Sequence, residues 1–293
     1  MKVFLWHKAS FILMGLGIFL IFHPIPFLAY FTYPILAWGL LGLLDLASLR
    51  RWKTSLMTSD PQRFWGIIVP ASTLFWLFFE FLNFLWPQWK YIAVPPSRIT
   101  ATVLSFVSYS TVIPLVIEVF WFISGPDQLQ GLSPAIARSI SARRWLFPAI
   151  GFALLLLFIF DRSFVTAQVM WCIPFFVILP FVPTAEVVPL KSKNILPALI
   201  GAAFLSGLIW ETGNNWAQTK WDYLLLRDAP HLFQMPLAGY LGYIPFAISL
   251  LVVYLWIHAK IAYTRLRTVT LYVLALLASR IFIMIYFAKF PLS

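Results

Sequence analysis

The chain has 293 residues, of which 61% are hydrophobic and only 11% are charged, and its formal net charge at pH 7 is +11. Soluble globular chains carry about 25% charged residues, and one of this length could not bury so much apolar surface. The composition therefore excludes a soluble domain. Because the basic residues stand in short clusters between apolar runs, we attribute them to membrane topology and lipid contact, and expect no nucleic-acid partner.

The chain also lacks the patterns that hold metals and cofactors. Its single cysteine, Cys172, excludes an internal disulfide and a cysteine metal cluster. The four histidines do not stand at metal-ligand spacings, and there is no Gly-rich phosphate loop. We therefore expect neither a metal nor a cofactor.

Apolar segments follow one another along the whole chain. A membrane-spanning helix needs roughly 20 mainly apolar residues, and the sequence predicts nine such segments, of which the fifth is short enough to leave the count open by one. We predict an all-α polytopic membrane helix bundle that forms a single membrane domain over 1–293. The predicted segments are 4–22, 27–48, 64–86, 101–123, 145–160, 164–183, 195–212, 236–257 and 269–288.

Lysine and arginine gather in alternate loops, for example at Arg50-Arg51, Arg143-Arg144 and Arg265. The positive-inside rule then places the N-terminus in the cytoplasm. No small-residue cleavage site follows the first apolar segment, so we interpret it as a retained helix. With no eukaryotic signal in the sequence, we expect the bacterial plasma membrane.

A pattern recurs between the third and the seventh segment. Phe79-Glu80-Phe81-Leu82-Asn83 corresponds to Trp210-Glu211-Thr212-Gly213-Asn214 at an offset of 131 residues. Each motif is followed by a Trp-x-Tyr element, and then by a tyrosine five residues before a proline. These further pairs are Trp89 and Trp221, Tyr91 and Tyr223, Tyr109 and Tyr240, and Pro114 and Pro245.

The pattern predicts two repeats, 27–160 and 161–293, preceded by an additional N-terminal helix at 1–26. Both glutamates fall on odd-numbered segments, so the repeats should have the same orientation. Such repeats are related by a pseudo-two-fold axis along the membrane normal.

Residues three apart share one helix face, and a carboxylate that faces lipid costs about 2.5–3.5 kcal/mol on insertion scales. Both motifs should therefore face one central cavity. We predict catalytic roles for Glu80, Glu211, Asn83 and Asn214, and substrate binding by Tyr109, Tyr240, Tyr243, Trp89, Trp221, Tyr91, Tyr223 and Arg280.

The charges of the two glutamates are expected to differ. Arg280 is the one cation placed to neutralise a carboxylate, so the glutamate beside it should be ionised and the other should hold its proton among aromatic side chains. Such a division lets two carboxyl groups act as acid and base. Asp45 stands near a helix end and is expected to be solvated, whereas the role of Glu118 stays open between packing and a second polar site.

The two motifs resemble small membrane enzymes of carotenoid metabolism, the heterodimer-type lycopene cyclases and the carotenoid hydratases. The matching parts are Glu80 to Tyr91 with Pro95-Pro96, and Glu211 to Tyr223 with Met235-Pro236. The paired acidic residues that follow the proline in the cyclases are missing here. The duplicated pattern also resembles an uncharacterised bacterial multi-pass membrane family.

The resemblance implies acid-catalysed cyclisation, hydration or isomerisation of a polyprenyl or carotenoid-type lipid, without a cofactor. Protonating an alkene needs a neutral carboxylic acid in a dry site, and aromatic rings stabilise the resulting carbocation. Two other classes of function stay open: a small transporter or flippase with a carboxylate-lined cavity, and a structural membrane subunit. The oligomeric state is left open.

Overall fold

The computed structural model describes residues 2–126, 134–183 and 195–290. Within these ranges eight helices are long and apolar enough to cross a membrane, and the strands are few and short. This confirms the predicted all-α polytopic bundle. The eight spans are Leu5–Phe22, Leu28–Trp52, Pro61–Leu85, Arg98–Ser124, Phe164–Phe181, Ile195–Trp216, Leu237–Lys260 and Arg265–Lys289.

The first half of the described chain contains α1 (Lys2–Phe22), η1 (Leu28–Phe31), α2 (Thr32–Trp52), α3 (Leu56–Ser59), α4 (Pro61–Arg63), the π-helical turn η2 (Phe64–Ile68), α5 (Val69–Leu85), β1 (Trp89–Ile92), α6 (Arg98–Tyr109), α7 (Val112–Ser124), α8 (Pro134–Ser141) and α9 (Leu146–Phe160). The second half contains α10 (Phe164–Val169), η4 (Met170–Cys172), α11 (Ile173–Ile178), η5 (Leu179–Phe181), α12 (Ile195–Trp216), β2 (Lys220–Tyr223), β3 (His231–Leu232), β4 (Met235–Pro236), η6 (Leu237–Gly242), α13 (Tyr243–Lys260) and α14 (Arg265–Lys289).

The predicted short fifth segment, 145–160, forms α9. Its 15 residues extend over about 22 Å at 1.5 Å per residue, less than the roughly 30 Å of a bilayer's hydrocarbon core. The helix is apolar along its length, exposes large side chains such as Phe152 and Phe160, and is too short to count as a ninth span.

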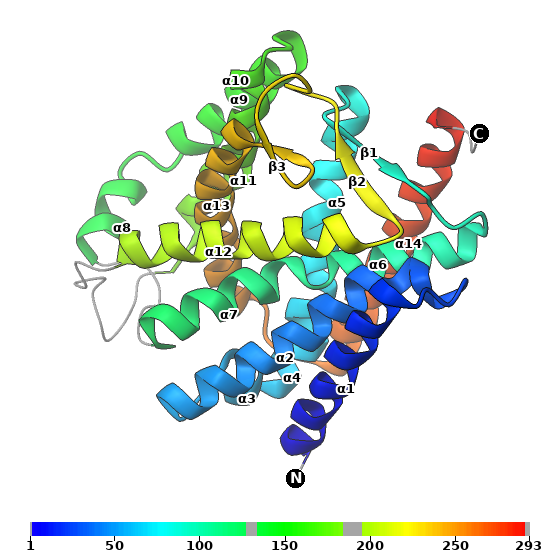
Figure 1. The fold of residues 1–293 in the computed structure, drawn as a ribbon. Helices are drawn as coiled ribbons and strands as arrows, with labels where there is room; N and C mark the ends of the chain where they lie inside the picture. The colour runs from blue at the N-terminus through cyan, green and yellow to red at the C-terminus, as the bar shows by residue number, and fades with distance from the viewer. Residues whose placement is uncertain (1, 127–133, 184–194, 291–293) are drawn as a thin grey trace.

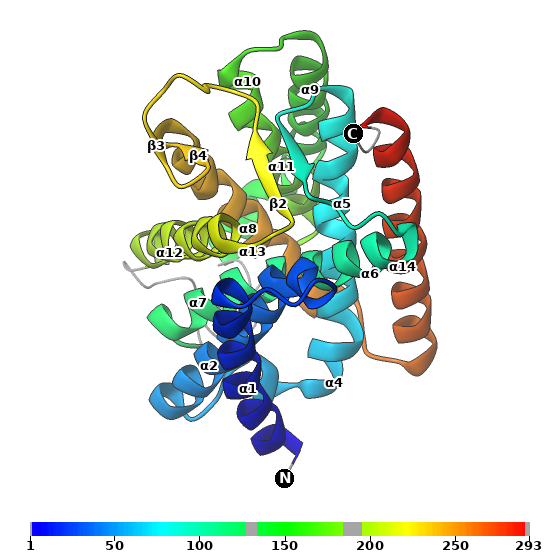
Figure 2. The same cartoon turned by 45° about the vertical axis from the view of Figure 1, so that its right-hand side comes forward.

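The helices run in two crossing sets (Figures 1 and 2). α7 and α12 lie side by side, while α5 and α14 lie side by side and cross them. α1 packs along α2 at the edge of the bundle, and only 22% of its apolar window is buried. Because apolar side chains on α1 stay exposed in the bundle, this edge is suited to contact lipid.

A break divides the span 98–124 at Ser110 and Thr111, shortly before Pro114, because a proline removes one backbone donor and clashes with the preceding turn. The Ser72 hydroxyl on α5 replaces the lost helix bonds. It donates to the Tyr109 carbonyl (2.7 Å) and accepts from the Ile113 N–H (2.9 Å). The span 237–260 changes in the same way from the 3-10 helix η6 to α13 before Pro245.

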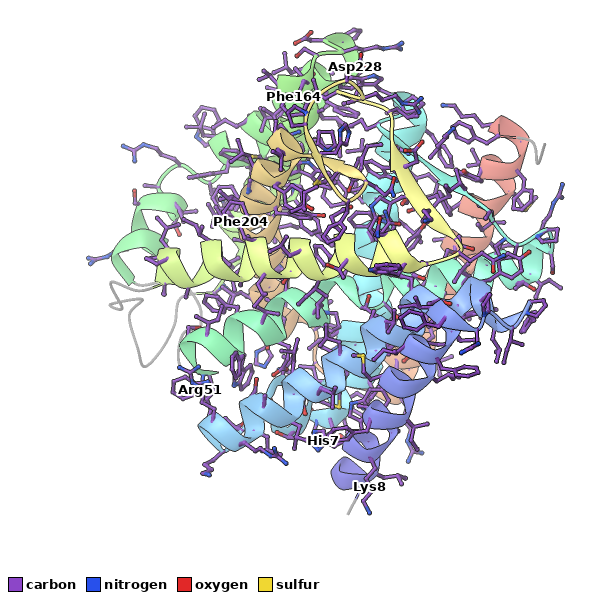
Figure 3. The ribbon with its side chains drawn as sticks, viewed as in Figure 1. His7, Lys8, Arg51, Phe164, Phe204 and Asp228 are labelled. Carbon is purple, nitrogen blue, oxygen red and sulfur yellow. The ribbon has the colours of Figure 1, made fainter. Side chains whose placement is uncertain are left out.

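The two ends of the bundle differ in charge pattern. Lys8 and Arg51 lie at one end, and Phe164 and Asp228 lie at the other (Figure 3). That the end with Lys8 and Arg51 faces the cytoplasm stays a prediction.

Asp45 is fully buried, and the expectation that it is solvated was wrong. Its Oδ2 lies 2.8 Å from His7 Nε2, and its Oδ1 accepts from the Met57 N–H (3.0 Å). The buried Glu118 accepts from the neighbouring Leu56 N–H (3.3 Å). The short segment around α3 packs against both α2 and α7, and it therefore covers a helix face that the sequence suggested was open to water.

Candidate functional site

β1 and β2 form an antiparallel ribbon over one end of the bundle (Figure 2). Lys90 lies opposite Asp222, while Trp89 lies opposite Tyr223 and Tyr91 lies opposite Trp221. A local two-fold axis therefore passes between Lys90 and Asp222 and relates the two Trp-x-Tyr elements to each other. Side chains alternate along a strand, so all four aromatic residues share one face and the Lys90–Asp222 pair (3.9 Å) occupies the other.

Four aromatic side chains surround Glu80, which is only 1% exposed. Trp76, one turn earlier on α5, donates its indole N–H to Oε1 (2.7 Å), and Trp89 lies 3.3 Å from Oε2. The Tyr91 hydroxyl donates a short hydrogen bond to Oε1, and the Tyr109 hydroxyl donates to Tyr91 (3.1 Å). A chain of two hydroxyl groups therefore ends at this carboxyl group.

Glu211 has an equivalent set of donors and is fully buried. Its Oε1 accepts from the Tyr223 hydroxyl (2.7 Å), the Tyr243 hydroxyl (2.9 Å) and the Trp221 indole (3.3 Å). Its Oε2 has no hydrogen-bond partner. The two glutamates are thus held alike by Trp-x-Tyr elements, and they differ in that one oxygen of Glu211 is free.

The two asparagines hold the ribbon. Asn83 donates to the Trp89 carbonyl (2.9 Å) and accepts from the Trp89 N–H (3.2 Å). Asn214 makes the same pair of bonds to Trp221, at 2.9 and 2.8 Å. Each side-chain amide therefore binds the ribbon as the backbone of a neighbouring strand would. This holds the tryptophan indole over the glutamate that lies on the same helix as the asparagine. Asn83 and Asn214 thus position the ribbon, and the catalytic role that the sequence suggested for them stays a prediction.

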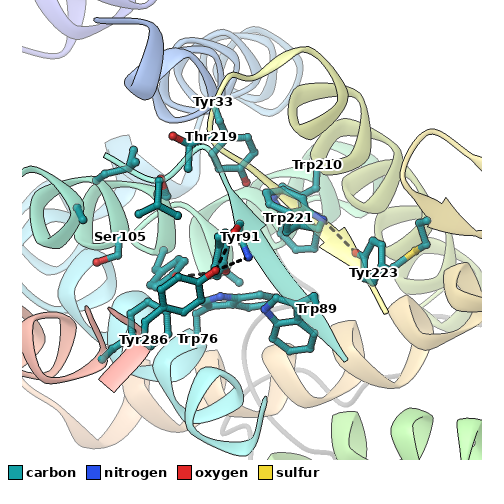
Figure 4. A pocket seen from close by; sticks show the side chains of 18 of the residues that line it. Tyr33, Trp76, Trp89, Tyr91, Ser105, Trp210, Thr219, Trp221, Tyr223 and Tyr286 are labelled. Atoms are coloured by element: carbon teal, nitrogen blue, oxygen red, sulfur yellow. Dashed lines mark hydrogen bonds between the residues drawn. The ribbon is translucent and has the colours of Figure 1, made fainter. Parts of the chain in front are cut away.

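A cavity of about 120 Å³ lies beneath the ribbon (Figure 4). Fourteen of its 25 lining residues are aromatic and none is charged. Side chains from both halves of the chain meet there, and the lining includes six residues for which the sequence suggested substrate binding: Trp89, Tyr91, Tyr109, Trp221, Tyr223 and Tyr243. The aromatic lining residues are Tyr30, Tyr33, Trp76, Trp89, Tyr91, Tyr109, Trp171, Trp210, Trp221, Tyr223, Tyr243, Phe246, Phe282 and Tyr286.

Glu80 and Glu211 do not line this cavity, contrary to the expectation that both would face it. Each carboxyl group lies behind tyrosine and tryptophan side chains that do line it, and bonds to their O–H and N–H groups. The reason is that several donors from helix and ribbon converge on each carboxyl group and cover it. Any proton exchanged with the cavity would therefore pass through a tyrosine hydroxyl.

Arg280 lies apart from both glutamates. Within the described residues it makes no ion pair, and its Nη1 is buried without a hydrogen-bond partner. α14 turns Phe282 and Tyr286 toward the cavity, and a residue two positions from Phe282 points about 200° away around a helix. The expected division of charge through Arg280 is therefore not supported by the contacts.

Tyr240 also departs from its expected place. Its hydroxyl donates to the Leu232 carbonyl (3.1 Å) in the β3–β4 hairpin, and the residue does not line the cavity. Tyr243, one helical turn later, reaches Glu211 instead. The alignment of Tyr240 with Tyr109 thus identifies equivalent helix positions with different contacts.

Several contributing residues were not predicted. Trp76 stands four positions before Glu80, a spacing that shares a helix face and could have identified it. Tyr286 on α14 accepts from the Tyr91 N–H (2.8 Å) and donates to the Tyr91 carbonyl (2.7 Å), so it anchors β1. Trp171 stacks on Trp89 with ring centroids 6.1 Å apart. Neither of these two belongs to the repeated pattern, so the sequence carried no signal for them.

Burial raises the pKa of the Tyr91 hydroxyl well above its usual value, and the nearby charge of Glu80 adds to this. Burial likewise raises the pKa of Tyr223, with Glu211 as the second cause. Both tyrosines therefore stay neutral at physiological pH. A neutral hydroxyl can both donate and accept, which is what passing a proton requires.

In the part of the chain that the structure describes, no three His, Cys, Asp or Glu side chains are grouped so as to hold a metal ion. His231 lies against the Ala229 carbonyl and does not approach either glutamate. Comparison with protein-family models, with curated proteins and with solved structures gave no match.

Proposed function

We propose that the protein is an intramembrane, cofactor-free enzyme that isomerises, cyclises or hydrates a polyprenyl-type lipid by acid catalysis. The observation that carries this proposal is the pairing of two glutamate–tyrosine chains on one aromatic cavity. We further propose the bacterial plasma membrane as its location, with a cytoplasmic N-terminus.

The size and lining of the cavity suit an apolar substrate. A water molecule needs about 10–15 Å³ of such space, so the cavity of about 120 Å³ accommodates roughly ten non-hydrogen atoms. That is one or two isoprene units, with the remainder of a longer lipid outside. The absence of charged residues among the lining side chains favours a neutral ligand.

The two chains provide one proton donor and one proton acceptor. In an isomerisation, a proton passes from a protonated glutamate through its tyrosine to one alkene carbon, and the π electrons form the new C–H bond. The resulting carbocation loses a proton from a neighbouring carbon to the other tyrosine, whose own proton moves to an ionised glutamate. Substrate and product are then isomers, and no oxidant or reductant is consumed.

The aromatic lining favours the charged intermediate. The faces of tryptophan and tyrosine rings attract a cation by about 0.5–2 kcal/mol each. Trp76, Trp89 and Trp171 lie with ring centroids about 6 Å apart from one another around the cavity. The indole N–H groups of Trp76 and Trp89 donate to Glu80. The ring faces can therefore stabilise a cation without reacting with it as nucleophiles.

Deuterium labelling tests this proposal. Membranes that contain the protein are incubated in D₂O with lipids extracted from cells that lack it, and the lipids are analysed by mass spectrometry. A product isomeric with its precursor and carrying one carbon-bound deuteron is expected, or one heavier by a water molecule. The Tyr91→Phe, Tyr223→Phe double variant should form none, whereas unchanged labelling in that variant would contradict the proposal.

The broken spans favour transport as a second candidate. The breaks before Pro114 and Pro245 adjoin the cavity in both repeats, as in carriers built from repeats with discontinuous helices. A carrier would move a lipid or solute without altering its mass or isomer composition. Flux across proteoliposomes, with no new species by mass spectrometry, would support transport in place of catalysis.

A further inference from the structure

A second hollow, of about 270 Å³, lies between α1, α2 and α12. It shares Tyr33 and Trp210 with the aromatic cavity, so these two side chains form a common wall. Figure 4 shows Tyr33 and Trp210 close to Trp221 at the edge of that cavity. We call this second hollow the side groove.

The side groove has the composition of a binding site for a hydrocarbon chain. Its lining includes Leu36 and Leu40 from α2, Leu208 from α12 and Met14 from α1, and it contains no charged residue. Leu208 is 38% exposed on the outer surface of the bundle. Because α1 and this face of α12 stand at the edge of the bundle, the side groove is placed to receive a lipid from the bilayer.

Small residues keep the side groove open. Ala37 and Gly213 both line it. A Cβ atom at Gly213 would lie 3.2 Å from Tyr33 Cδ2, so a larger residue would push the Tyr33 ring toward the cavity. The position of the Tyr33 ring in the wall between the two hollows therefore depends on Gly213.

Trp210 places a polar group, its indole N–H, in the wall between the two hollows. The residue is 5% exposed, yet its indole N–H has no hydrogen-bond partner. A buried donor left unpaired is unfavourable, and the equivalent residue of the first repeat, Phe79, has no such donor. An unpaired N–H on a ring that lines both hollows indicates that a ligand oxygen completes it.

We infer that one lipid occupies both hollows: its saturated or distal chain lies in the side groove, and its reactive end lies in the aromatic cavity with an oxygen accepting from Trp210 Nε1. The ligand class is a neutral, single-chain lipid that carries a hydroxyl or carbonyl group. That this ligand is the substrate rests on the proposed function, but its binding does not.

Photocrosslinking tests the inference with two probes. One is a C20 prenol with a diazirine near its hydrocarbon end, and the other is a straight-chain C16 alcohol with the same group. The full chain is placed in nanodiscs and irradiated, and the labelled residues are mapped by mass spectrometry. Labels concentrated at residues 36–40 and 208–213 are expected, whereas labels spread evenly over the exposed faces of α9 and α14 would overturn the inference.

Matched variants sharpen the test. Leu208→Trp fills the side groove from its exposed rim and should reduce labelling there several-fold. Leu205→Trp, at a similarly exposed position of α12 outside the side groove, should leave it unchanged. Trp210→Phe restores the residue of the first repeat, and should reduce the preference for the prenol over the corresponding alkene by about fivefold, the value of one hydrogen bond.

Further arms separate this inference from the proposed function. The Glu80→Gln, Glu211→Gln double variant should lose turnover and still be labelled in the side groove. Unchanged labelling of the side groove in Leu208→Trp would overturn the inference and leave the proposed enzyme intact. Preferential labelling by the straight-chain alcohol would support the side groove as a lipid site, and would count against a polyprenyl substrate.

Discussion

The ring of Tyr243 packs directly on Gly207, at a place where any Cβ atom would lie 2.9 Å from Tyr243 Cγ and closer still to the ring edge. In the first repeat the two equivalent positions hold Trp76 and Val112. Each glutamate therefore receives its additional donor from a different helix. Trp76 on α5 serves Glu80, and Tyr243 on α13 serves Glu211 from the space that Gly207 leaves.

This packing predicts the effect of a single methyl group. Gly207→Ala should displace Tyr243 from Glu211 and remove one hydrogen bond, at a cost of about 1–2 kcal/mol in the free energy of unfolding. Gly201→Ala is the matched control on α12, because its Cβ atom meets nothing closer than 3.7 Å. The control should be neutral or stabilising by up to about 1 kcal/mol. Thermal unfolding in detergent measures both, and equal midpoints would contradict the packing argument.

Because Oε2 of Glu211 has no hydrogen-bond partner, we expect Glu80→Gln and Glu211→Gln to lower stability by different amounts. In Glu80→Gln, the new NH₂ group must face a tryptophan N–H in either orientation, since Trp76 donates to Oε1 and the Trp89 N–H lies 3.4 Å from Oε1 and 3.3 Å from Oε2. In Glu211→Gln it can occupy the position of Oε2, which has no partner. Two donors that face each other leave one buried N–H group unpaired, which lowers the free energy of unfolding by about 1–3 kcal/mol.

We therefore expect Glu80→Gln to lower the unfolding midpoint clearly more than Glu211→Gln does. Both variants make the same substitution of an amide for a carboxyl group of nearly equal size, so each is the other's control. A larger loss for Glu211→Gln would show that the hydrogen bonds around the two glutamates are not arranged as described.

The tyrosines of the ribbon predict a loss of stability at alkaline pH. The folded-state pKa of Tyr91 and of Tyr223 is raised, while in the unfolded chain a tyrosine titrates near pH 10. Below that pH both states hold the proton, so stability is unchanged. As the pH rises above about 10, only the unfolded chain ionises, and the folded state loses stability.

Chemical unfolding at a series of pH values between 8 and 11 measures this loss. The Tyr91→Phe, Tyr223→Phe double variant lacks these two groups and should show a shallower decline than the wild type. An equally steep decline in both proteins would assign the effect to other groups.

The sequence predicted the helical bundle and much of the site, because both follow from local patterns. Apolar runs identify spans by length, and the spacing from Glu80 to Trp89 and Tyr91, repeated at Glu211, identified residues that do meet. The ribbon itself was not predicted. Its four-residue strands pair across about 130 positions of the chain, and so short a strand has no distinct sequence signal.

The errors share a physical cause. Placing Arg280 beside a carboxyl group, and leaving Asp45 in water, both required knowledge of which helix face turns inward. Depth along a span can be estimated from the sequence, but rotation about the helix axis is set by packing against neighbours. α14 turns Phe282 inward in place of Arg280, and the segment after α2 folds back over Asp45.

Asp45 gives a last prediction about the end of the bundle that carries His7. Its two oxygens serve different partners, His7 Nε2 and the Met57 N–H, and all lie in buried surroundings. Asp45→Leu would leave both partners unpaired and should lower the free energy of unfolding by about 3–5 kcal/mol, the cost of breaking a buried pair. Asp45→Asn keeps one acceptor oxygen and should cost less than half of that. Asp60→Asn is the control, because this half-exposed residue caps α4 and makes a surface ion pair with Arg63 (3.6 Å) that is worth little, and asparagine caps a helix as well as aspartate. Equal losses for Asp45→Leu and Asp45→Asn in thermal unfolding would show that the charge of Asp45, and not its two hydrogen bonds, fixes α3 against α2.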